Sequence, residues 1–167
     1  MTDELPRAAG AVVEAGRALG LDLEVREFPE GTRTAADAAA AIGCQVGQIV
    51  KSLVFMADQD PLLVLTSGAN RVDVVKVGQT SGAVTVRKAD AGEVRAATGY
   101  AIGGTPPFGH ARALQVLVDE DLTRFEEVWA AAGTPRHVFP IAAGELVRVT
   151  GGRVADVAMD ETGPPAG

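Results

Sequence analysis

The residues best suited to chemistry form a short loop between two apolar segments, where two adjacent glycines precede two adjacent prolines. Gly103 and Gly104 can adopt positive φ angles and allow another molecule to approach the backbone closely. Pro106 and Pro107 restrict the chain and supply no N–H group. The loop is therefore open to a ligand and rigid at once. The alternative is a tight turn that binds nothing, because Gly–Pro clusters usually mark turns.

Lys51 is a second candidate, because it interrupts an apolar strand in the stretch QIVKSLVFMA. If its ammonium points into a cleft, it supplies a point charge for a phosphate or a carboxylate. Alternation along the strand equally allows Lys51 to face solvent, or to extend its charge past the edge of the sheet. Ser52, the next residue, would face the other side of the strand.

Most familiar catalytic motifs are missing from the chain. It has no G-x-S-x-G, no G-x-x-x-x-G-K-[ST] and no C-x-x-C sequence. Its two histidines, His110 and His137, lie far apart, whereas a zinc site needs three or four ligands. The one cysteine, Cys44, is interpreted as a small buried residue. We therefore expect a site without a metal or another cofactor.

Length and composition favour one globular domain of 167 residues, 47% hydrophobic and 22% charged. A single cysteine excludes an intrachain disulfide and favours a reducing compartment. No apolar run approaches the roughly 20 residues of a membrane span, and the N-terminus is acidic where a signal peptide is basic. We therefore expect a cytoplasmic protein that does not enter membranes.

Charge is distributed unevenly along the chain. The net charge is −7, which argues against a protein that coats nucleic acid. Residues 48–112 nevertheless contain seven basic and five acidic residues, so this segment carries +2 and its flanks together −9. The glycine–proline loop lies in this segment. A local site for one or two phosphates is compatible with the pattern, and a long basic groove is not.

Hydrophobic periodicity predicts helices and strands that mix without a strict β-α-β rhythm, which favours an α/β or mixed α+β layer fold. Thr34 is expected to cap an alanine-rich helix that Gly43 ends. Residues 71–78 fit either a helix or a strand. The other expected helices are 3–20, 88–99, 120–133 and 142–152; the strands are 21–28, two within 49–68 joined by a turn at 58–61, 114–119 and 137–141, with a terminal segment at 153–158.

In this order, the motifs resemble the YbaK/EbsC family of aminoacyl-tRNA deacylases, which is related to the editing domain of bacterial prolyl-tRNA synthetases. The most specific are VGQIVKSLVF, with the family's lysine at Lys51, and ATGYAIGGTPPFG, with its G-x-x-x-P loop at residues 103–107. VLVDEDL around Asp119 and VWAAAGTP around Gly133 follow in the expected order. The resemblance implies a single layered domain over residues 1–160, with a mixed, mostly antiparallel sheet flanked by helices, and a flexible tail at 161–167.

The resemblance also implies hydrolysis of the ester between a wrong amino acid and the terminal ribose of tRNA, of the Cys-, Ala- or Pro-tRNA type. The partner would be the acceptor end of tRNA, with a prolyl-tRNA synthetase as a further candidate. The expected catalytic residues are Lys51, Gly103, Gly104 and Thr105, with the backbone N–H groups of the loop as an oxyanion site. The expected substrate-binding residues are Phe28, Thr34, Ile49, Pro107, Phe108, His110, Asp119 and Gly133.

Alternatives remain for two residues and for the function. His110 either contacts the substrate or is a solvated loop residue. Asp119 either orients Lys51 or caps a helix that begins at Glu120. The same cleft could instead bind an aminoacyl-adenylate-like ligand or a synthetase without turnover. A metal-dependent hydrolase is a third, more distant reading.

Overall fold

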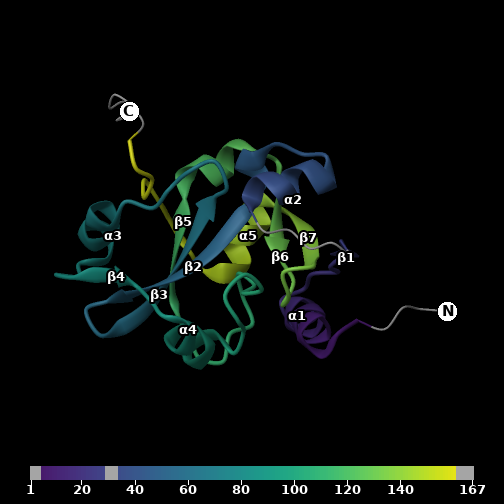
Figure 1. Cartoon of the computed structure of the whole chain (residues 1–167), viewed down its shortest axis with the longest axis horizontal. Coiled ribbons are helices and arrows are strands. Elements are labelled where there is room, and N and C mark those ends of the chain that lie inside the picture. The colour runs from purple at the N-terminus through teal and green to yellow at the C-terminus, as the bar shows by residue number, and fades with distance from the viewer. Residues whose placement is uncertain (1–4, 29–33, 161–167) are drawn as a thin grey trace.

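The computed structural model describes residues 5–28 and 34–160, which form two sheets with helices around them (Figure 1). The helices within these ranges are α1 (Arg7–Ala18), α2 (Ala35–Ile42), α3 (Val74–Ser81), α4 (Ala91–Thr98), α5 (Ala143–Thr150) and the 3-10 helices η1 (Val46–Gln48) and η2 (Glu120–Arg124). The strands are β1 (Arg26–Glu27), β2 (Val50–Ala57), β3 (Asp60–Ser67), β4 (Val86–Lys88), β5 (Gln115–Asp119), β6 (Glu127–Ala131), β7 (His137–Ala142) and β8 (Arg153–Ala155).

The larger sheet has the strand order β4-β2-β3-β5-β8, and the smaller sheet has the order β1-β7-β6. The pairs β3–β5 and β5–β8 are parallel, and the remaining neighbours are antiparallel. A parallel bridge between Ile49 and Trp129 connects the two sheets. In Figure 1 the smaller sheet and α1 occupy one side of the molecule, and α3, β4 and α4 the other. The expected mixed, mostly antiparallel arrangement is confirmed.

The core lies on both faces of the larger sheet, because side chains alternate along β2 and β3. Val50 and Val54 belong to a cluster that includes α1, β6 and β7, whereas Phe55 belongs to a cluster on the opposite face with Val77 of α3. The hairpin between β2 and β3 turns at Asp58, whose φ of 58° is a value that aspartate tolerates better than most residues. This alternation sends Lys51 and Ser52 to opposite faces.

The helix expected after Thr34 is confirmed. The Thr34 hydroxyl accepts a hydrogen bond from the Asp37 N–H at 3.0 Å, and Gly43 ends α2 at a φ of 88°. Residues 71–78, which fitted either element, belong largely to α3, because Asp73 caps that helix by accepting from the N–H groups of Val75 and Lys76.

Two expected elements were wrong. Residues 21–25 are not a strand, and only Arg26–Glu27 pairs with β7. The apolar residues Leu21 and Leu23 pack against the main core as extended chain, and Leu23 fills the space beside Gly16 of α1. Their alternation reflects this packing rather than a sheet.

The long helix expected over 120–133 is also wrong, because η2 covers only Glu120–Arg124 and β6 follows it. Val128 and Ala130 alternate inward and pair with β7, so sheet pairing overrides the helical propensity of this segment. Smaller differences affect the ends of other elements: α1 begins at Arg7, and Lys88 belongs to β4 rather than to α4. The expected tail at 161–167 lies outside the described residues. No helix within the described ranges has the length and apolar character that a membrane span requires.

Candidate functional site

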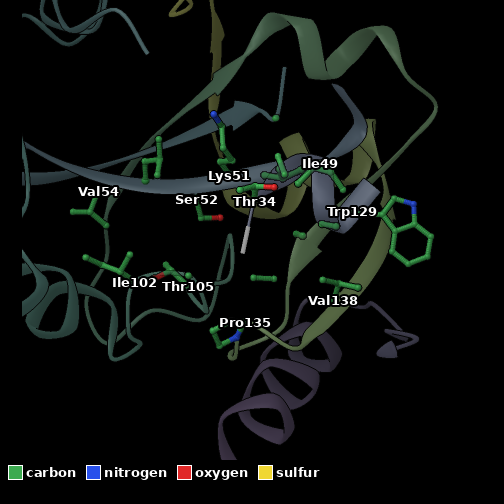
Figure 2. Close-up of a pocket in the computed structure, with 18 of the residues that line it drawn as sticks. Thr34, Ile49, Lys51, Ser52, Val54, Ile102, Thr105, Trp129, Pro135 and Val138 are labelled. Atoms are coloured by element: carbon green, nitrogen blue, oxygen red, sulfur yellow. The ribbon is translucent and has the colours of Figure 1, made fainter. Parts of the chain in front are cut away.

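A cavity of about 610 Å³ lies between β2, the start of α2, the glycine–proline loop and the turn that joins β6 to β7 (Figure 2). It is bordered by segments far apart in sequence, which only the folded chain brings together. Its walls are largely apolar. The lining residues that matter below are Thr34, Ile49, Lys51, Ser52, Val54, Lys88, Ile102, Gly103, Thr105, Trp129, Pro135 and Val138.

The cavity exists because β2 is unpaired along part of one edge. On one side β3 pairs with the whole of β2, but on the other side β4 pairs only with residues 55–57. At one end of the unpaired stretch, Ile49 bridges to Trp129. At the other end, the Ala89 N–H donates to the Val54 carbonyl at 3.0 Å. The backbone between these points borders the cavity, where a ligand can reach it.

The glycine–proline loop forms the opposite wall. Gly103 has a φ of 91°, and a Cβ built there would lie 3.6 Å from Pro135, which is ordinary contact. Gly104 is packed much more tightly, since its Cβ would lie 2.6 Å from the Gly133 carbonyl oxygen. Gly103 therefore supplies the backbone conformation, and Gly104 allows two loops to touch.

The N–H groups of the loop are not equivalent. The Gly104 N–H donates to the Ala101 carbonyl at 3.1 Å, and the Thr105 hydroxyl donates to the same oxygen at 3.1 Å. Within the described part of the chain, the N–H groups of Gly103 and Thr105 have no hydrogen-bond partner. Of the three N–H groups between residues 103 and 107, those of Gly103 and Thr105 can therefore be directed at a ligand without breaking the loop.

Lys51 is half-buried, and its Nζ donates to the Asn70 carbonyl at 2.6 Å. Burial lowers the pKa of this ammonium, and the positive charges of Lys88 and Arg71 lower the pKa further, whereas Asp119 acts in the opposite direction. Lys51 and Ser52 leave β2 in opposite directions, as expected for neighbours on a strand (Figure 2). Lys51 therefore places a cation, fixed by its hydrogen bond to the Asn70 carbonyl, at the border of the cavity.

Asp119 forms a hydrogen bond with Asn70, the residue whose carbonyl accepts from Lys51. Its carboxylate is fully buried and accepts hydrogen bonds from the Asn70 side chain at 2.9 Å, the Ser67 N–H at 3.0 Å and the Asp121 N–H at 3.0 Å. The last bond caps η2. Asp119 thus caps the short helix η2, and it is also bonded to the side chain of the residue whose carbonyl accepts from Lys51. No motif in the sequence singled out Asn70.

His110 fastens the far end of the loop. Its Nε2 donates to the Pro106 carbonyl at 2.7 Å, and burial lowers the pKa of its imidazole. Phe108 is buried in the core, with its ring centroid 5.7 Å from that of Phe139. Gly133 packs against α1, where a Cβ would lie 2.6 Å from the Ala8 carbonyl oxygen. These three residues therefore support the loop and do not line the cavity.

The predicted site residues thus divide into two groups. Those that line the cavity are Thr34, Ile49, Lys51, Gly103 and Thr105. Those that do not line it are Phe28, Gly104, Pro107, Phe108, His110, Asp119 and Gly133. Phe28 packs against the cluster that forms the Ile49–Trp129 wall, so it lies one layer away.

Several lining residues were missed by the sequence. Ser52 borders the cavity with a buried hydroxyl that has no hydrogen-bond partner among the described residues. Lys88 adds a second cation. Trp129 and Val138 come from β6 and β7, of which the first was expected to be helical. Of these lining residues, only Ser52 could have been found from the sequence, because it is adjacent to the candidate Lys51.

The chain is similar to known proteins over most of its length. Residues 29–149 match the aminoacyl-tRNA editing domain family. The uncharacterized protein YwhH of Bacillus subtilis is 34% identical over 139 residues, which are 82% of this chain and 88% of that protein. A protein of Enterococcus faecalis named "Putative Cys-tRNA(Pro)/Cys-tRNA(Cys) deacylase EbsC" is 24% identical over 80% of this chain and 82% of its own.

A solved structure is also similar over nearly the whole chain. It is described as "a putative trans-editing enzyme for prolyl tRNA synthetase" and is 46% identical. The superposition covers 94% of this chain and 100% of that one, with a TM-score of 0.90. Fold and sequence therefore agree on the same group of proteins.

Proposed function

The chain belongs to the aminoacyl-tRNA editing domain family, and we propose that it acts in trans as a hydrolase that removes a wrong amino acid from tRNA. The observation that carries this proposal is the cavity itself. The unpaired edge of β2 with Lys51 lies on one side, and on the other lies the glycine–proline loop, whose Gly103 and Thr105 N–H groups have no hydrogen-bond partner among the described residues. The loop N–H groups suit the carbonyl oxygen of an ester, and the lysine suits a charged or hydroxyl group beside that ester.

The chemistry needs no side-chain nucleophile, because an aminoacyl ester is already activated. Attack by water on the ester carbonyl carbon develops negative charge on the carbonyl oxygen, and collapse of this intermediate releases the amino acid and the ribose hydroxyl. The N–H groups of Gly103 and Thr105 are the donors for that charge, and each such donor is worth about 2.7–4 kcal/mol. The Gly104 N–H, which was expected to share this role, instead holds the turn. The prolines and His110 restrict the loop and so keep the two N–H groups in position.

Lys51 positions the end of the tRNA rather than reacting with it. Its ammonium donates to Asn70 and retains two further N–H groups. These can hold the terminal ribose or its phosphate while the ester lies over the loop. Ser52 offers a hydroxyl to the same cavity from the other face of the strand.

The lining of the cavity supports a substrate amino acid with a small, uncharged side chain, of the Ala, Pro or Cys type. Ile49, Val54, Trp129 and Val138 offer apolar surface, and no carboxylate lines the cavity within the described chain. A synthetase pocket distinguishes amino acids that differ by one methylene by only about 1–3 kcal/mol, so a second hydrolytic site improves fidelity. A prolyl-tRNA synthetase is the partner that the similar solved structure suggests.

A deacylation screen across mischarged tRNAs tests the proposal. We expect loss of the ester from at least one of Ala-, Cys- or Pro-tRNA, with and without a chelator. The Lys51→Ala variant serves as the control for contaminating hydrolases. Protection of the ester without its loss would refute the enzyme in favour of a binding module. Loss of activity with chelator would refute the metal-independent mechanism.

A further inference from the structure

Ser52 lies in the middle of the unpaired edge of β2, and its main-chain groups face that edge. In an antiparallel strand, successive residues direct their N–H and carbonyl groups to opposite sides. The Ile49 carbonyl accepts from the Gly68 N–H on the β3 side at 2.7 Å, whereas the Val54 carbonyl accepts from the Ala89 N–H on the other side at 3.0 Å. Ser52 has the parity of Val54, so its N–H and carbonyl point to the side where β4 pairs only with residues 55–57.

The side chain of Ser52 also lacks a partner. Its hydroxyl oxygen is buried and forms no hydrogen bond with the described residues, although most buried hydroxyls in proteins are bonded. Ser52 lines the cavity, and its side chain leaves β2 on the side of Thr105, away from that of Lys51 (Figure 2). Rotation about one bond moves the hydroxyl between its staggered positions. Ser52 therefore offers the cavity two acceptors, a main-chain carbonyl and a hydroxyl.

The two walls of the cavity thus differ in polarity. The loop supplies the N–H donors of Gly103 and Thr105, and β2 supplies the acceptors of Ser52. An aminoacyl ester has the matching groups, because its carbonyl oxygen accepts and the ammonium on the adjacent carbon only donates. Burial of an ammonium without acceptors is costly, and no carboxylate lines the cavity within the described ranges. The lining hydroxyls of Thr34 and Thr105 are already bonded to the backbone.

We propose that Ser52 binds the α-ammonium group of the aminoacyl ester through its main-chain carbonyl and its hydroxyl. The proposal rests on the proposed function, to which it adds a requirement on the substrate. An acylated amine carries no charge and has at most one N–H, so it cannot donate to both acceptors of Ser52. The site therefore accepts an aminoacyl-tRNA with a free amine and rejects an ester whose amine is part of a peptide bond, as in a peptidyl-tRNA.

The test compares 3′-deoxy-3′-(L-alanylamino)adenosine, an amide that is not an ester, with its N-acetyl derivative. Dissociation constants are measured by calorimetry at about pH 6.5, where the free amine is charged. We expect the wild-type protein to bind the free amine about 10- to 100-fold more tightly. Ser52→Ala should reduce this preference by about three- to tenfold, because the carbonyl remains, and Ser52→Thr should keep it. Ser81→Ala is the matched control, because Ser81 ends α3 and does not line the cavity.

Thermal melting of the same variants separates binding from a structural role. A buried hydroxyl without a partner does not stabilise the fold, so Ser52→Ala should have a Tm equal to or above that of wild type. A fall of several degrees would show that the hydroxyl supports the fold and would overturn the proposal.

Each outcome decides the proposal separately from the deacylase activity. Equal affinities of the wild-type protein for the two adenosine derivatives would overturn it, as would an unchanged preference in Ser52→Ala or an equal loss of affinity for both derivatives. Equal hydrolysis of a mischarged tRNA and its N-acetylated form would refute the amine site and leave the hydrolase standing. A preference for the free amine in a protein that hydrolyses no aminoacyl-tRNA would support the amine site and refute the proposed function instead.

Discussion

Replacement of Gly103 by alanine separates a functional loop from a mere turn. A Cβ at this position meets nothing closer than Pro135 at 3.6 Å, so the variant has no steric clash. Its φ of 91° is unfavourable for alanine, and a residue held in a positive-φ conformation costs about 1–3 kcal/mol. For a domain of this size, that corresponds to a fall in Tm of about 2–4 °C for each kcal/mol.

Such a loss of stability is too small to affect activity by itself. A domain with about 5–15 kcal/mol of stability remains about 99% folded after losing 2 kcal/mol. If the Gly103 N–H faces the carbonyl oxygen of the ester, however, displacement of that donor reduces the single-turnover deacylation rate by about 100- to 1000-fold. The two effects thus differ by more than an order of magnitude.

The assay is single-turnover deacylation well below Tm, with thermal melting of the same samples. Gly82→Ala is the matched control, because Gly82 has a φ of 80°, ends α3 and has nothing within 4 Å of its Cβ position. We expect both variants to lose similar stability and only Gly103→Ala to lose activity. A well-folded Gly103→Ala protein with the wild-type rate would refute the oxyanion role of the loop.

Four further predictions concern the lysine and the tRNA contact. Lys51→Ala should retain its Tm within a few degrees and reduce deacylation severely; an unchanged rate constant would exclude the positioning role. Asp119→Ala should destabilise the protein, by about 1–3 kcal/mol in denaturant melts, because the N–H groups of Ser67 and Asn70 lose a buried acceptor; a stability equal to that of wild type would contradict this network. The pKa of Lys51 is lowered, so its charge is present at low pH and is lost as pH rises through that value; we expect enzymatic deacylation, corrected for spontaneous hydrolysis, to fall with it, and a rate that keeps rising would argue against a charged Lys51. The slope of log K for tRNA binding against log salt should be shallow, about one to three, since each phosphate contributes close to one unit; a slope near ten would reveal a phosphate-binding surface outside the cavity.

Local patterns in the sequence were sufficient for several elements of the site. Thr34 and Gly43 delimit α2 because a side-chain cap and a left-handed residue act within a few positions of the chain. The β2–β3 hairpin follows from two apolar runs around a short turn. Lys51 is visible as a charge in an apolar strand, and Gly103 as a glycine beside prolines. Each of these signals depends on neighbours in sequence.

The tertiary structure decided which of those residues meet, and what each backbone group does. The segment around Trp129 became a strand because β7 lies beside it, and no property of residues 120–133 alone reveals that partner. Phe108 is apolar enough for either a pocket wall or the core, and its contact with Phe139 places it in the core. The Gly104 N–H is engaged by Ala101, so only the folded loop distinguishes it from the N–H of Gly103. Asn70 matters because the folded chain places its carbonyl 2.6 Å from the Lys51 Nζ and its side-chain amide 2.9 Å from the Asp119 carboxylate, and contacts of that kind depend on distances in space that sequence spacing does not encode.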